Sequence, residues 1–215
     1  MKISDIEVKT FVNSDFEENL FVVFVKGGKE CLMIDPGMEP GEAIAFIKEK
    51  GLTPKGVLIT HGHYDHIAGV DRVKAEWPDV PVMISEIDRP KMTNPAGNLS
   101  AHFGFPVTTK DADRAIANGE FLTIAGITLR AILVPGHSSG HLVYRIDGED
   151  GTILFVGDVI FAGSIGRTDF PDGNMDHLLW GIRKYLLPLP DDTVFYTGHG
   201  PATTAGQEKR YNQGR

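Results

Sequence analysis

The sequence has little of what secreted, membrane-spanning or nucleic-acid-binding proteins need. Its single cysteine, Cys31, allows no internal disulfide, fits a reducing compartment and is expected to be a buried strand thiol. No apolar run approaches the length of a membrane span, and acidic residues stand near the N-terminus where a signal peptide has its apolar region. The formal net charge is −8 without any basic block, which disfavours phosphate backbones as partners. We therefore expect a cytoplasmic protein that binds neither membrane nor nucleic acid.

Composition and patterning predict one globular domain over residues 1–215. Of the 215 residues, 41% are hydrophobic and 23% are charged, which is enough apolar material for a sizeable core. No Pro/Gly/Ser-rich linker or fixed-period repeat divides the chain. Strand patterns fall in two clusters, each followed by helices, so the expected fold class is α/β (α+β), with two β-sheets packed face to face and helices outside.

The hydrophobic periodicity and the turn signals place the elements as follows. Strands are expected at 6–12, 20–25, 31–34, 57–59, 80–84, 121–124, 127–134, 141–146, 152–156 and 193–196. Helices are expected at 41–50, 67–77, 175–186 and 207–212, and a long irregular loop at 89–106. Long ordered loops are often functional, so this loop is a candidate substrate-lining segment.

Three histidines and one aspartate stand within six residues, directly after the apolar strand at 57–59. The run reads Thr60-His61-Gly62-His63-Tyr64-Asp65-His66. Imidazole nitrogen and carboxylate oxygen are ligands for borderline transition metals. Burying four such groups together is costly unless a cation, or the groups themselves, satisfy them. The run therefore predicts a metal site.

Three further polar groups follow apolar strands later in the chain, each beside a glycine. They are His137, Asp158 and His199. If the strand ends converge on one edge of the sheets, seven ligands face each other. Seven are too many for one tetrahedral site and fit two adjacent metal ions, with one carboxylate shared by both. The alternative, a surface histidine loop with unrelated histidines elsewhere, does not explain the repeated strand-end placement.

This pattern resembles the metallo-β-lactamase superfamily, whose signature is HxHxDH followed by single His, Asp and His ligands. The resemblance covers almost the whole chain and implies a four-layer αβ/βα sandwich. It implies that His61, His63 and His137 hold a first metal ion, that Asp65, His66 and His199 hold a second, and that Asp158 bridges them. It also implies that Asp35 hydrogen-bonds to a ligand. The two divalent ions are expected to be zinc first, with iron or manganese as alternatives.

Smaller motifs narrow the resemblance within the superfamily. Asp65 is followed by His66 and no cysteine ligand is present, which favours a dinuclear thioesterase-type site over true β-lactamases. The segment 135–141 (PGHSSGH) is similar to the PGHTxGH segment of glyoxalase II, and 163–170 (GSIGRTDF) is similar to the short glyoxalase II-like hydrolases. The GRTDF part also occurs in the persulfide dioxygenases and does not separate the two groups.

The chain departs from full-length glyoxalase II at its C-terminal end. Only sixteen residues follow His199, so the helical domain that grips glutathione in glyoxalase II is expected to be missing. Arg167 stands where glyoxalase II has a substrate-binding lysine. Its guanidinium could clamp a substrate carboxylate or form a structural ion pair with Asp169 or Asp172, and the sequence leaves both interpretations open.

The resemblance implies hydrolysis of a thioester, such as S-lactoylglutathione, by a metal-bridging hydroxide, with Asp65 and Asp158 as the catalytic carboxylates. A rival is a mononuclear-iron glutathione persulfide dioxygenase that uses His61, His137 and Asp158. Other small esters or lactones are alternative substrates, and a binding module without catalysis is a third reading that the intact ligands disfavour. The expected partner is a small-molecule thioester, possibly a glutathione conjugate, and the protein is expected to be a monomer or a homodimer.

Other histidines are expected outside the ligand set. His141 is expected to pack beside the site and His177 to be structural. His102, in the loop at 89–106, is either solvated or substrate-lining.

Overall fold

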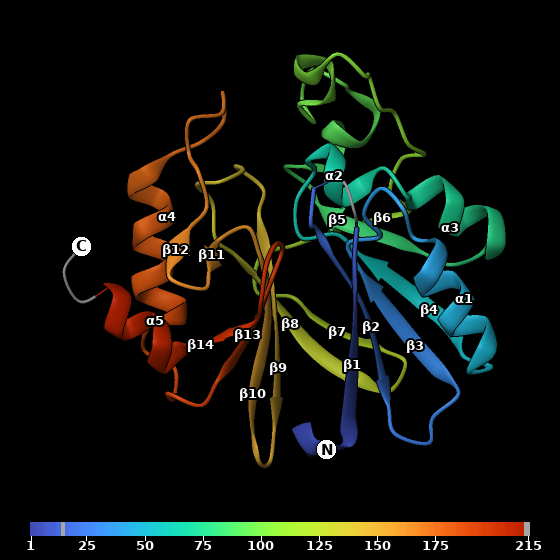
Figure 1. The fold of residues 1–215 in the computed structure, drawn as a ribbon, viewed down its shortest axis with the longest axis horizontal. Coiled ribbons are helices and arrows are strands. Elements are labelled where there is room, and N and C mark those ends of the chain that lie inside the picture. The colour runs from blue at the N-terminus through green and yellow to red at the C-terminus, as the bar shows by residue number, and fades with distance from the viewer. Residues whose placement is uncertain (14–15, 213–215) are drawn as a thin grey trace.

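The computed structural model describes residues 1–13 and 16–212. Two six-stranded sheets lie face to face with helices on their outer faces, as the sequence predicts (Figure 1). The strand order is β1-β2-β3-β4-β5-β6 in the first sheet and β14-β13-β10-β9-β8-β7 in the second. In Figure 1, α1 and α3 lie on the right beside the first sheet, and α4 and α5 lie on the left beside the second.

The first half of the chain forms the first sheet and its helices. Its strands are β1 (Ile6–Val12), β2 (Asn19–Val25), β3 (Glu30–Ile34), β4 (Thr53–Leu58), β5 (Val82–Ser85) and β6 (Arg114–Ile116). Its helices are α1 (Gly41–Glu49), α2 (Tyr64–Ile67) and α3 (Val70–Glu76), with short 3₁₀ helices η1 (Ile3–Asp5), η2 (Arg89–Thr93) and η3 (Ser100–Phe103). The expected irregular loop at 89–106 thus contains η2 and η3.

The second half repeats this arrangement. Its sheet contains β7 (Phe121–Ile124), β8 (Ile127–Leu133), β9 (Leu142–Gly148), β10 (Gly151–Gly157), β13 (Val194–Thr197) and β14 (Thr203–Thr204), and β11 (Ile160–Phe161) pairs with β12 (Ser164–Ile165) in a separate hairpin. Its helices are α4 (Met175–Gly181), the π-helical turn η4 (Ile182–Leu186) and α5 (Ala205–Asn212).

Strand direction decides where the site forms. β10 pairs with β13 in parallel, and β8 and β10 both run antiparallel to β9 between them. β8, β10 and β13 therefore run in one direction, and their carboxyl ends lie at the same edge of the second sheet. In the first sheet, β3, β4, β5 and β6 are parallel neighbours.

Three apolar cores separate the four layers, because successive strand residues point to opposite faces. In β2, Phe21 and Val23 enter the core between the sheets, whereas Leu20 and Val22 face α1 and α3. In β10, Ile153 and Phe155 face the first sheet, whereas Leu154 and Val156 belong to the core beneath α4 and α5. Both sheets are thus buried on two sides, which confirms the predicted sandwich.

The single helix predicted at 67–77 is wrong. The structure forms α2 and α3, separated at Gly69. A Cβ atom at Gly69 would lie 2.7 Å from the carbonyl oxygens of Pro36 and Gly37, and the Gly69 amide donates to the Gly37 carbonyl at 2.5 Å. The turn after β3 therefore presses against the chain here and divides the helix.

Other strand boundaries differ from the predicted ones because hydrogen bonding to a neighbouring strand, rather than local propensity, decides where a strand begins and ends. β4 begins at Thr53, before the predicted strand at 57–59, since its parallel partner β3 aligns Glu30 with Thr53. Four strands were not predicted: β6, β11, β12 and β14 are only two or three residues long and carry no periodic signal of their own.

Candidate metal centre

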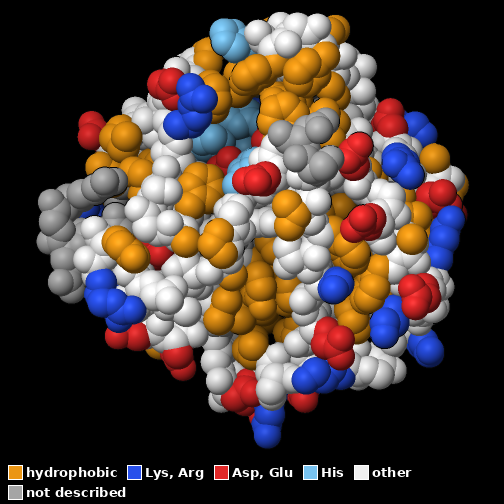
Figure 2. Space-filling model, in the orientation of Figure 1, with side chains coloured by type: hydrophobic (Ala, Val, Ile, Leu, Met, Phe, Trp, Pro, Cys, Tyr) orange, Lys and Arg blue, Asp and Glu red, His pale blue; other side chains and the backbone are white. Residues whose placement is uncertain are grey.

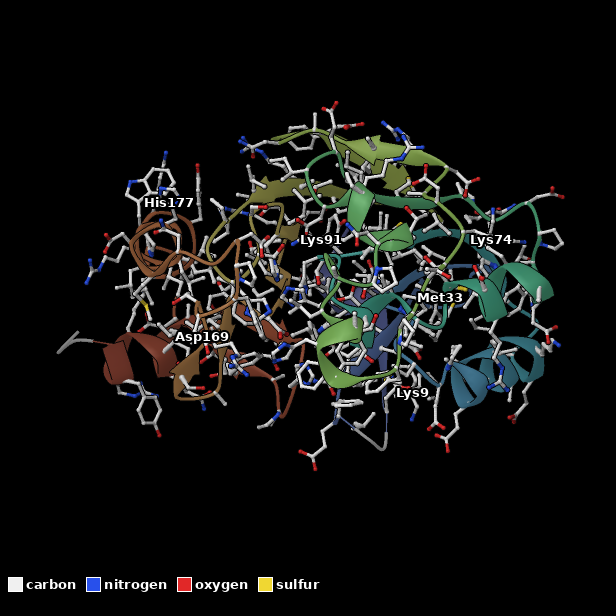
Figure 3. The ribbon with its side chains drawn as sticks, turned by 90° about the horizontal axis from the view of Figure 1, so that it is seen from above. Lys9, Met33, Lys74, Lys91, Asp169 and His177 are labelled. Atoms are coloured by element: carbon white, nitrogen blue, oxygen red, sulfur yellow. The ribbon has the colours of Figure 1, made fainter. Side chains whose placement is uncertain are left out.

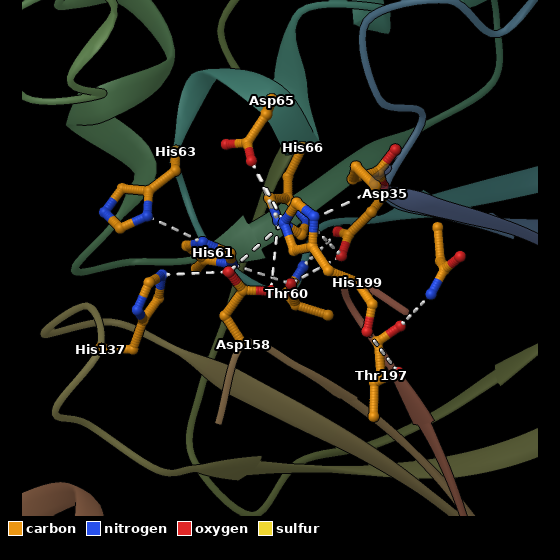
Figure 4. A network of polar contacts seen from close by, with 12 residues as sticks. Asp35, Thr60, His61, His63, Asp65, His66, His137, Asp158, Thr197 and His199 are labelled. Carbon is orange, nitrogen blue, oxygen red and sulfur yellow. Dashed lines mark hydrogen bonds and ion pairs between the residues drawn. The ribbon is translucent and has the colours of Figure 1, made fainter. Parts of the chain in front are cut away.

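Loops at the ends of four strands bring the seven predicted ligand residues together between the two sheets (Figure 4). The segment after β4 carries His61 and His63 and runs into α2, which begins at Tyr64 and carries Asp65 and His66. The segments after β8, β10 and β13 carry His137, Asp158 and His199. The expected convergence is therefore what the structure shows.

Four groups of described side chains have metal-ligand spacing; two of them are His61/His66/Asp158 and Glu18/Asp35/His66. Ligand atoms of His61, His63 and His137 lie within 4.8 Å of one another, and so do those of Asp65, His66 and His199. These are the two sets that the resemblance implied. The first set is fully buried, whereas Asp65 and His199 have 16% and 25% of their side chains exposed. The second set is therefore more open to a ligand from outside.

Asp158 joins the two groups. Its Oδ2 lies 3.4 Å from His137 Nε2 and 3.6 Å from His199 Nε2, and its Oδ1 lies 3.5 Å from His66 Nε2. One carboxylate thus faces both sets, which is the geometry of a group that could bridge two ions.

Outer hydrogen bonds orient the rings so that Nε2 points inward. Nδ1 of His137 donates to the Arg167 carbonyl oxygen at 2.8 Å, and Nδ1 of His199 donates to the Phe16 carbonyl oxygen at 2.8 Å. Because a backbone carbonyl only accepts, each ring carries its hydrogen on Nδ1 and keeps the Nε2 lone pair for a ligand.

Asp35 orients one ring in each group. Its Oδ2 lies 3.0 Å from His66 Nδ1 and accepts from Thr60 Oγ1 at 2.7 Å. Thr60 Oγ1 in turn lies 3.1 Å from His61 Nδ1. Since the hydroxyl hydrogen goes to Asp35, Thr60 accepts from His61, whose Nε2 keeps its lone pair and lies 3.0 Å from His63 Nδ1. Asp35 thus makes the ligand hydrogen bond that the resemblance implied, and Thr60 extends it to the other set.

The charge balance around the first set suits neutral ligands. Burial lowers the pKa of His61 and of His63 well below the usual imidazole value, and the neighbouring histidines lower it further. Both rings are therefore neutral, which is the form that binds metal.

Three carboxylates act on His66 in the second set. Burial alone would lower the pKa of His66, but Asp65, Asp158 and Asp35 raise it well above the usual imidazole value. Burial alone would raise the pKa of Asp158, but His66, His137 and His199 hold it well below the usual carboxyl range. A site that favours cationic partners this strongly is suited to a metal cation.

Unpaired polar atoms at the centre show that the residues fit metal ions. His66 Nε2, His137 Nε2 and Asp158 Oδ1 are buried without a hydrogen-bond partner. Buried polar atoms are rarely left unpaired, since each costs about 1–3 kcal/mol. Divalent cations held by these nitrogen and oxygen donors would satisfy them.

Two glycines make room for this centre. Gly157 has φ +49°, and a Cβ there would lie 2.6 Å from Thr60 Oγ1 and 2.7 Å from His141 Nε2. A Cβ at Gly198 would overlap Asp158 Oδ1. Larger residues at either position would displace the groups that carry the site.

His141 lies beside the ligands without joining a ligand group. Its ring stacks on His61 with centroids 4.7 Å apart, and its Nε2 accepts from the Asp158 amide at 3.0 Å. His102 is exposed in η3, and His177 lies in α4, where its amide donates to the side chain of the N-cap residue Asn174. Cys31 is fully buried, as predicted, and burial raises the pKa of its thiol to about 12.

Sequence reasoning missed a buried carboxylate that ties both ligand loops together. Asp88 is fully buried and accepts from the amides of Gly62 and Gly140, both at 2.9 Å, and from Ser138 Oγ. Gly62 lies between His61 and His63, whereas Ser138 and Gly140 follow His137. The available signal was its position: Asp88 follows the end of β5, which is parallel to the ligand-bearing β4.

Lys91 completes this network. Figure 3 shows it near the middle of the molecule, between His177 and Lys74 at opposite ends. Its Nζ lies 3.1 Å from Asp88 Oδ1 and 2.6 Å from both Asp172 Oδ2 and Ser138 Oγ. The expected partner Asp172 is therefore bound to Lys91, not to Arg167.

A pocket of about 240 Å³ opens above the ligand groups. Its lining residues are Phe16, His63, Tyr64, Asp65, Leu99, Phe103, His137, Asp158, Arg167, Phe170 and His199. Figure 2 shows histidine side chains at the floor of this hollow and hydrophobic side chains above it. A groove of about 470 Å³, about twice the volume of that pocket, is lined by Thr10, Phe21 and Tyr196 among others and contains none of the seven residues.

Arg167 lines the pocket and also forms the predicted ion pair. Its Nε and Nη2 donate to the two carboxylate oxygens of Asp169 at 2.7 and 2.6 Å, and its guanidinium lies 4.4 Å from the Phe170 ring centroid. The structural pairing is thus observed, and a substrate role remains a prediction.

Fold and site together define a two-sheet αβ/βα protein with a histidine- and carboxylate-rich cation centre at the sheet edge. The family model of the metallo-β-lactamase superfamily matches residues 17–199. The chain therefore belongs to that superfamily, as a metallo-hydrolase that could hold divalent metal ions.

Two relatives match nearly the full chain. The probable metallo-hydrolase YqgX of Bacillus subtilis is 39% identical over 190 residues, covering 88% of this chain and 89% of the relative. The hydroxyacylglutathione hydrolase GloC of Haemophilus influenzae is 37% identical over 199 residues, covering 92% of each.

Two solved structures share the fold and a substantial part of the sequence. The BLEG-1 B3 metallo-β-lactamase superposes with a TM-score of 0.90 at 38% identity, covering 96% of this chain and 98% of that one. TTHA1623 in a di-iron-bound form superposes with a TM-score of 0.81 at 31% identity, covering 97% and 100%. Within the described residues, no helix is long and apolar enough to cross a membrane.

Proposed function

We propose that the protein hydrolyses thioesters, with S-lactoylglutathione or a related acyl-thiol as substrate and two divalent metal ions as cofactors. The observation that carries the proposal is the pairing of two ligand groups through Asp158 at the floor of a pocket. The likeness to the GloC hydroxyacylglutathione hydrolase supports a thioester, and the di-iron-bound TTHA1623 supports two ions in such a site.

We assign the ligands as the geometry groups them. His61, His63 and His137 would hold one ion, Asp65, His66 and His199 the other, and Asp158 both. When bound, the ions supply Lewis acidity, which polarises a carbonyl and lowers the pKa of water. Zinc, iron and manganese all suit imidazole and carboxylate donors, and zinc is the ion we expect first.

The residues of the chain position the reactants. Asp65 lines the pocket, and its Oδ2 lies 3.3 Å from His199 Nε2, so its carboxylate can accept a hydrogen from the attacking water and aim its oxygen at the acyl carbon. The water oxygen bonds to that carbon as one proton passes to Asp65, and the carbon–sulfur bond breaks with its electron pair on sulfur. The proton then passes from Asp65 to the thiolate, so a carboxylic acid and a thiol result. Because a thiolate is a good leaving group, no strong general acid is required.

Three assays on the metal-loaded protein distinguish this proposal from its rivals. Thioester cleavage is followed by thiol release, persulfide oxidation by oxygen uptake with glutathione persulfide, and β-lactam opening by absorbance. The β-lactam arm is included because the chain resembles the BLEG-1 B3 metallo-β-lactamase. We expect thiol release to exceed the other two activities. Oxygen uptake or β-lactam opening without thiol release would contradict the proposal.

A further inference from the structure

We propose that the preferred substrates are thioesters with an apolar acyl group, held against an aromatic wall formed by Phe16, Tyr64, Phe103 and Phe105. This inference rests on the proposed thioester hydrolysis and adds the substrate class. Phe16, Tyr64 and Phe103 line the pocket above the ligand groups, and Phe105 packs against them.

The aromatic wall is assembled from three separate parts of the chain. Tyr64, in α2, stands between the ligands His63 and Asp65 and is buried. Its ring centroid lies 5.4 Å from that of Phe16, before β2, 5.5 Å from that of Phe103, in η3, and 5.2 Å from that of Phe105. These are the distances of packed aromatic pairs, so the wall is a built surface beside the ligands.

The outer rings of the wall are exposed. Phe16, Phe103 and Phe105 have 36%, 47% and 37% of their surface accessible. Apolar side chains gathered around a pocket mark places where a ligand covers them. Because Tyr64 joins the wall to the ligand segment, a group bound against it lies next to the proposed reaction centre.

The pocket volume assigns the acyl group, rather than the thiol, to this surface. About 240 Å³ is below the roughly 300–1,000 Å³ of pockets that enclose drug-sized ligands. A short acyl chain fits such a space, whereas a tripeptide thiol must extend beyond it.

The charges around the pocket offer little to glutathione's carboxylates. Arg167 is the one Lys or Arg among the described lining residues, and Asp169 already binds it through two hydrogen bonds. Lys91 precedes Phe103 in the loop at 89–106, but its ammonium group is already bound to Asp88 and Asp172. The glutathione part of a substrate therefore gains less binding energy in this pocket than an apolar acyl group does.

The test compares six thioesters on the metal-loaded protein: acetyl, lactoyl and butanoyl groups, each on glutathione and on N-acetylcysteamine. We expect kcat/KM to be higher for butanoyl than for lactoyl on either thiol. From acetyl to butanoyl it should rise by up to about fourfold per methylene. Exchanging N-acetylcysteamine for glutathione should change kcat/KM by less than about fivefold, because an exposed ion pair contributes no more than that to binding.

Phe103→Ala tests the wall itself, and Phe121→Ala is the matched control. Phe121 is 68% exposed on β7 and does not line the pocket. The gain from acetyl to butanoyl should shrink in Phe103→Ala and persist in Phe121→Ala. An equal gain in both variants would overturn the role of the wall, and the wild-type series decides the substrate class even if a variant folds poorly.

The possible outcomes distinguish a failure of this inference from a failure of the proposed thioester hydrolysis. If none of the thioesters is cleaved, the proposed function fails. If they are cleaved but lactoyl equals or exceeds butanoyl, or glutathione is favoured far more than fivefold, thioester hydrolysis stands and the apolar-acyl inference is wrong.

Discussion

Asp88→Ala is predicted to destabilise the metal-free protein far more than an ordinary loss of a surface charge. Asp88 is fully buried and holds Lys91, whose side chain is only 11% exposed. It also accepts from the amides of Gly62 and Gly140, which lie in the two loops that carry His61, His63 and His137. Without it, Lys91 loses one of its two carboxylate partners, and the two backbone amides lose their acceptor.

The expected magnitude follows from these contacts. Removing one partner of a buried ion pair costs about 3–5 kcal/mol, and the remaining bond from Lys91 to Asp172 keeps the loss from exceeding that range. A domain typically has about 5–15 kcal/mol of stability, so most of the variant should remain folded. Since the loops then lose their common anchor, metal affinity should also fall, by about 10–100-fold.

Asp111→Ala is the matched control. Asp111 also pairs with a cation of the same segment, Arg89, at 2.8 Å, but the two side chains are 52% and 39% exposed. An exposed pair contributes about 0–1 kcal/mol, so this variant should stay near wild type.

The assay is urea unfolding of both variants in the presence of a chelator, followed by metal titration of the folded proteins. Asp88→Asn adds an isosteric arm: its single amide oxygen cannot accept from all the donors, so it should fall between wild type and Asp88→Ala. Unfolding free energies of Asp88→Ala and Asp111→Ala within about 1 kcal/mol of each other would show that the buried pair contributes no more than the exposed one, contrary to this prediction.

Three further predictions concern single residues. Asp158→Ala should lower bound metal and cut thioester turnover by orders of magnitude, as measured by elemental analysis and thiol release, and full metal content with full turnover would contradict its bridging position. Asp169→Asn should release the Arg167 guanidinium and lower KM for glutathione thioesters relative to N-acetylcysteamine thioesters; an unchanged ratio would exclude Arg167 from substrate binding. The Cys31 thiol, with its pKa raised by burial to about 12, should resist disulfide reagents at pH 8 until the protein is unfolded. Because the unfolded chain loses this proton first, the thiol's contribution to stability is complete below about pH 8.5 and declines by up to about 1.4 kcal/mol per pH unit from there towards pH 12, and a Cys31→Ala variant should lack that decline.

The sandwich and the convergence of the seven candidate ligand residues could be predicted because local signals and long-range packing agree there. Apolar strands such as β2 and β10 are buried on both faces, so their composition alone marks them. His61, His137 and Asp158 each follow such a strand. Because the strands of each sheet that carry them run in one direction, their carboxyl ends bring these residues to the same edge. A prediction based on strand ends therefore survives errors of a few residues in the boundaries.

What the sequence did not yield depends on contacts between distant segments. The break at Gly69 arises from the turn at Pro36 and Gly37, about thirty residues away. Asp88 has a role only because Gly62 and Gly140 approach it from opposite halves of the chain. The hydrophobic periodicity of one segment does not reveal contacts with a distant segment. The aromatic wall could not be predicted for the same reason, since its rings come from three separate parts of the chain.

The central claim is that the seven converging residues hold two metal ions per chain. Elemental analysis of freshly purified, anaerobically handled protein tests this most directly. We expect close to two divalent ions per chain, zinc or iron or a mixture, bound tightly enough to survive gel filtration. Close to one iron per chain and little else would contradict the dinuclear centre and favour a mononuclear oxygenase.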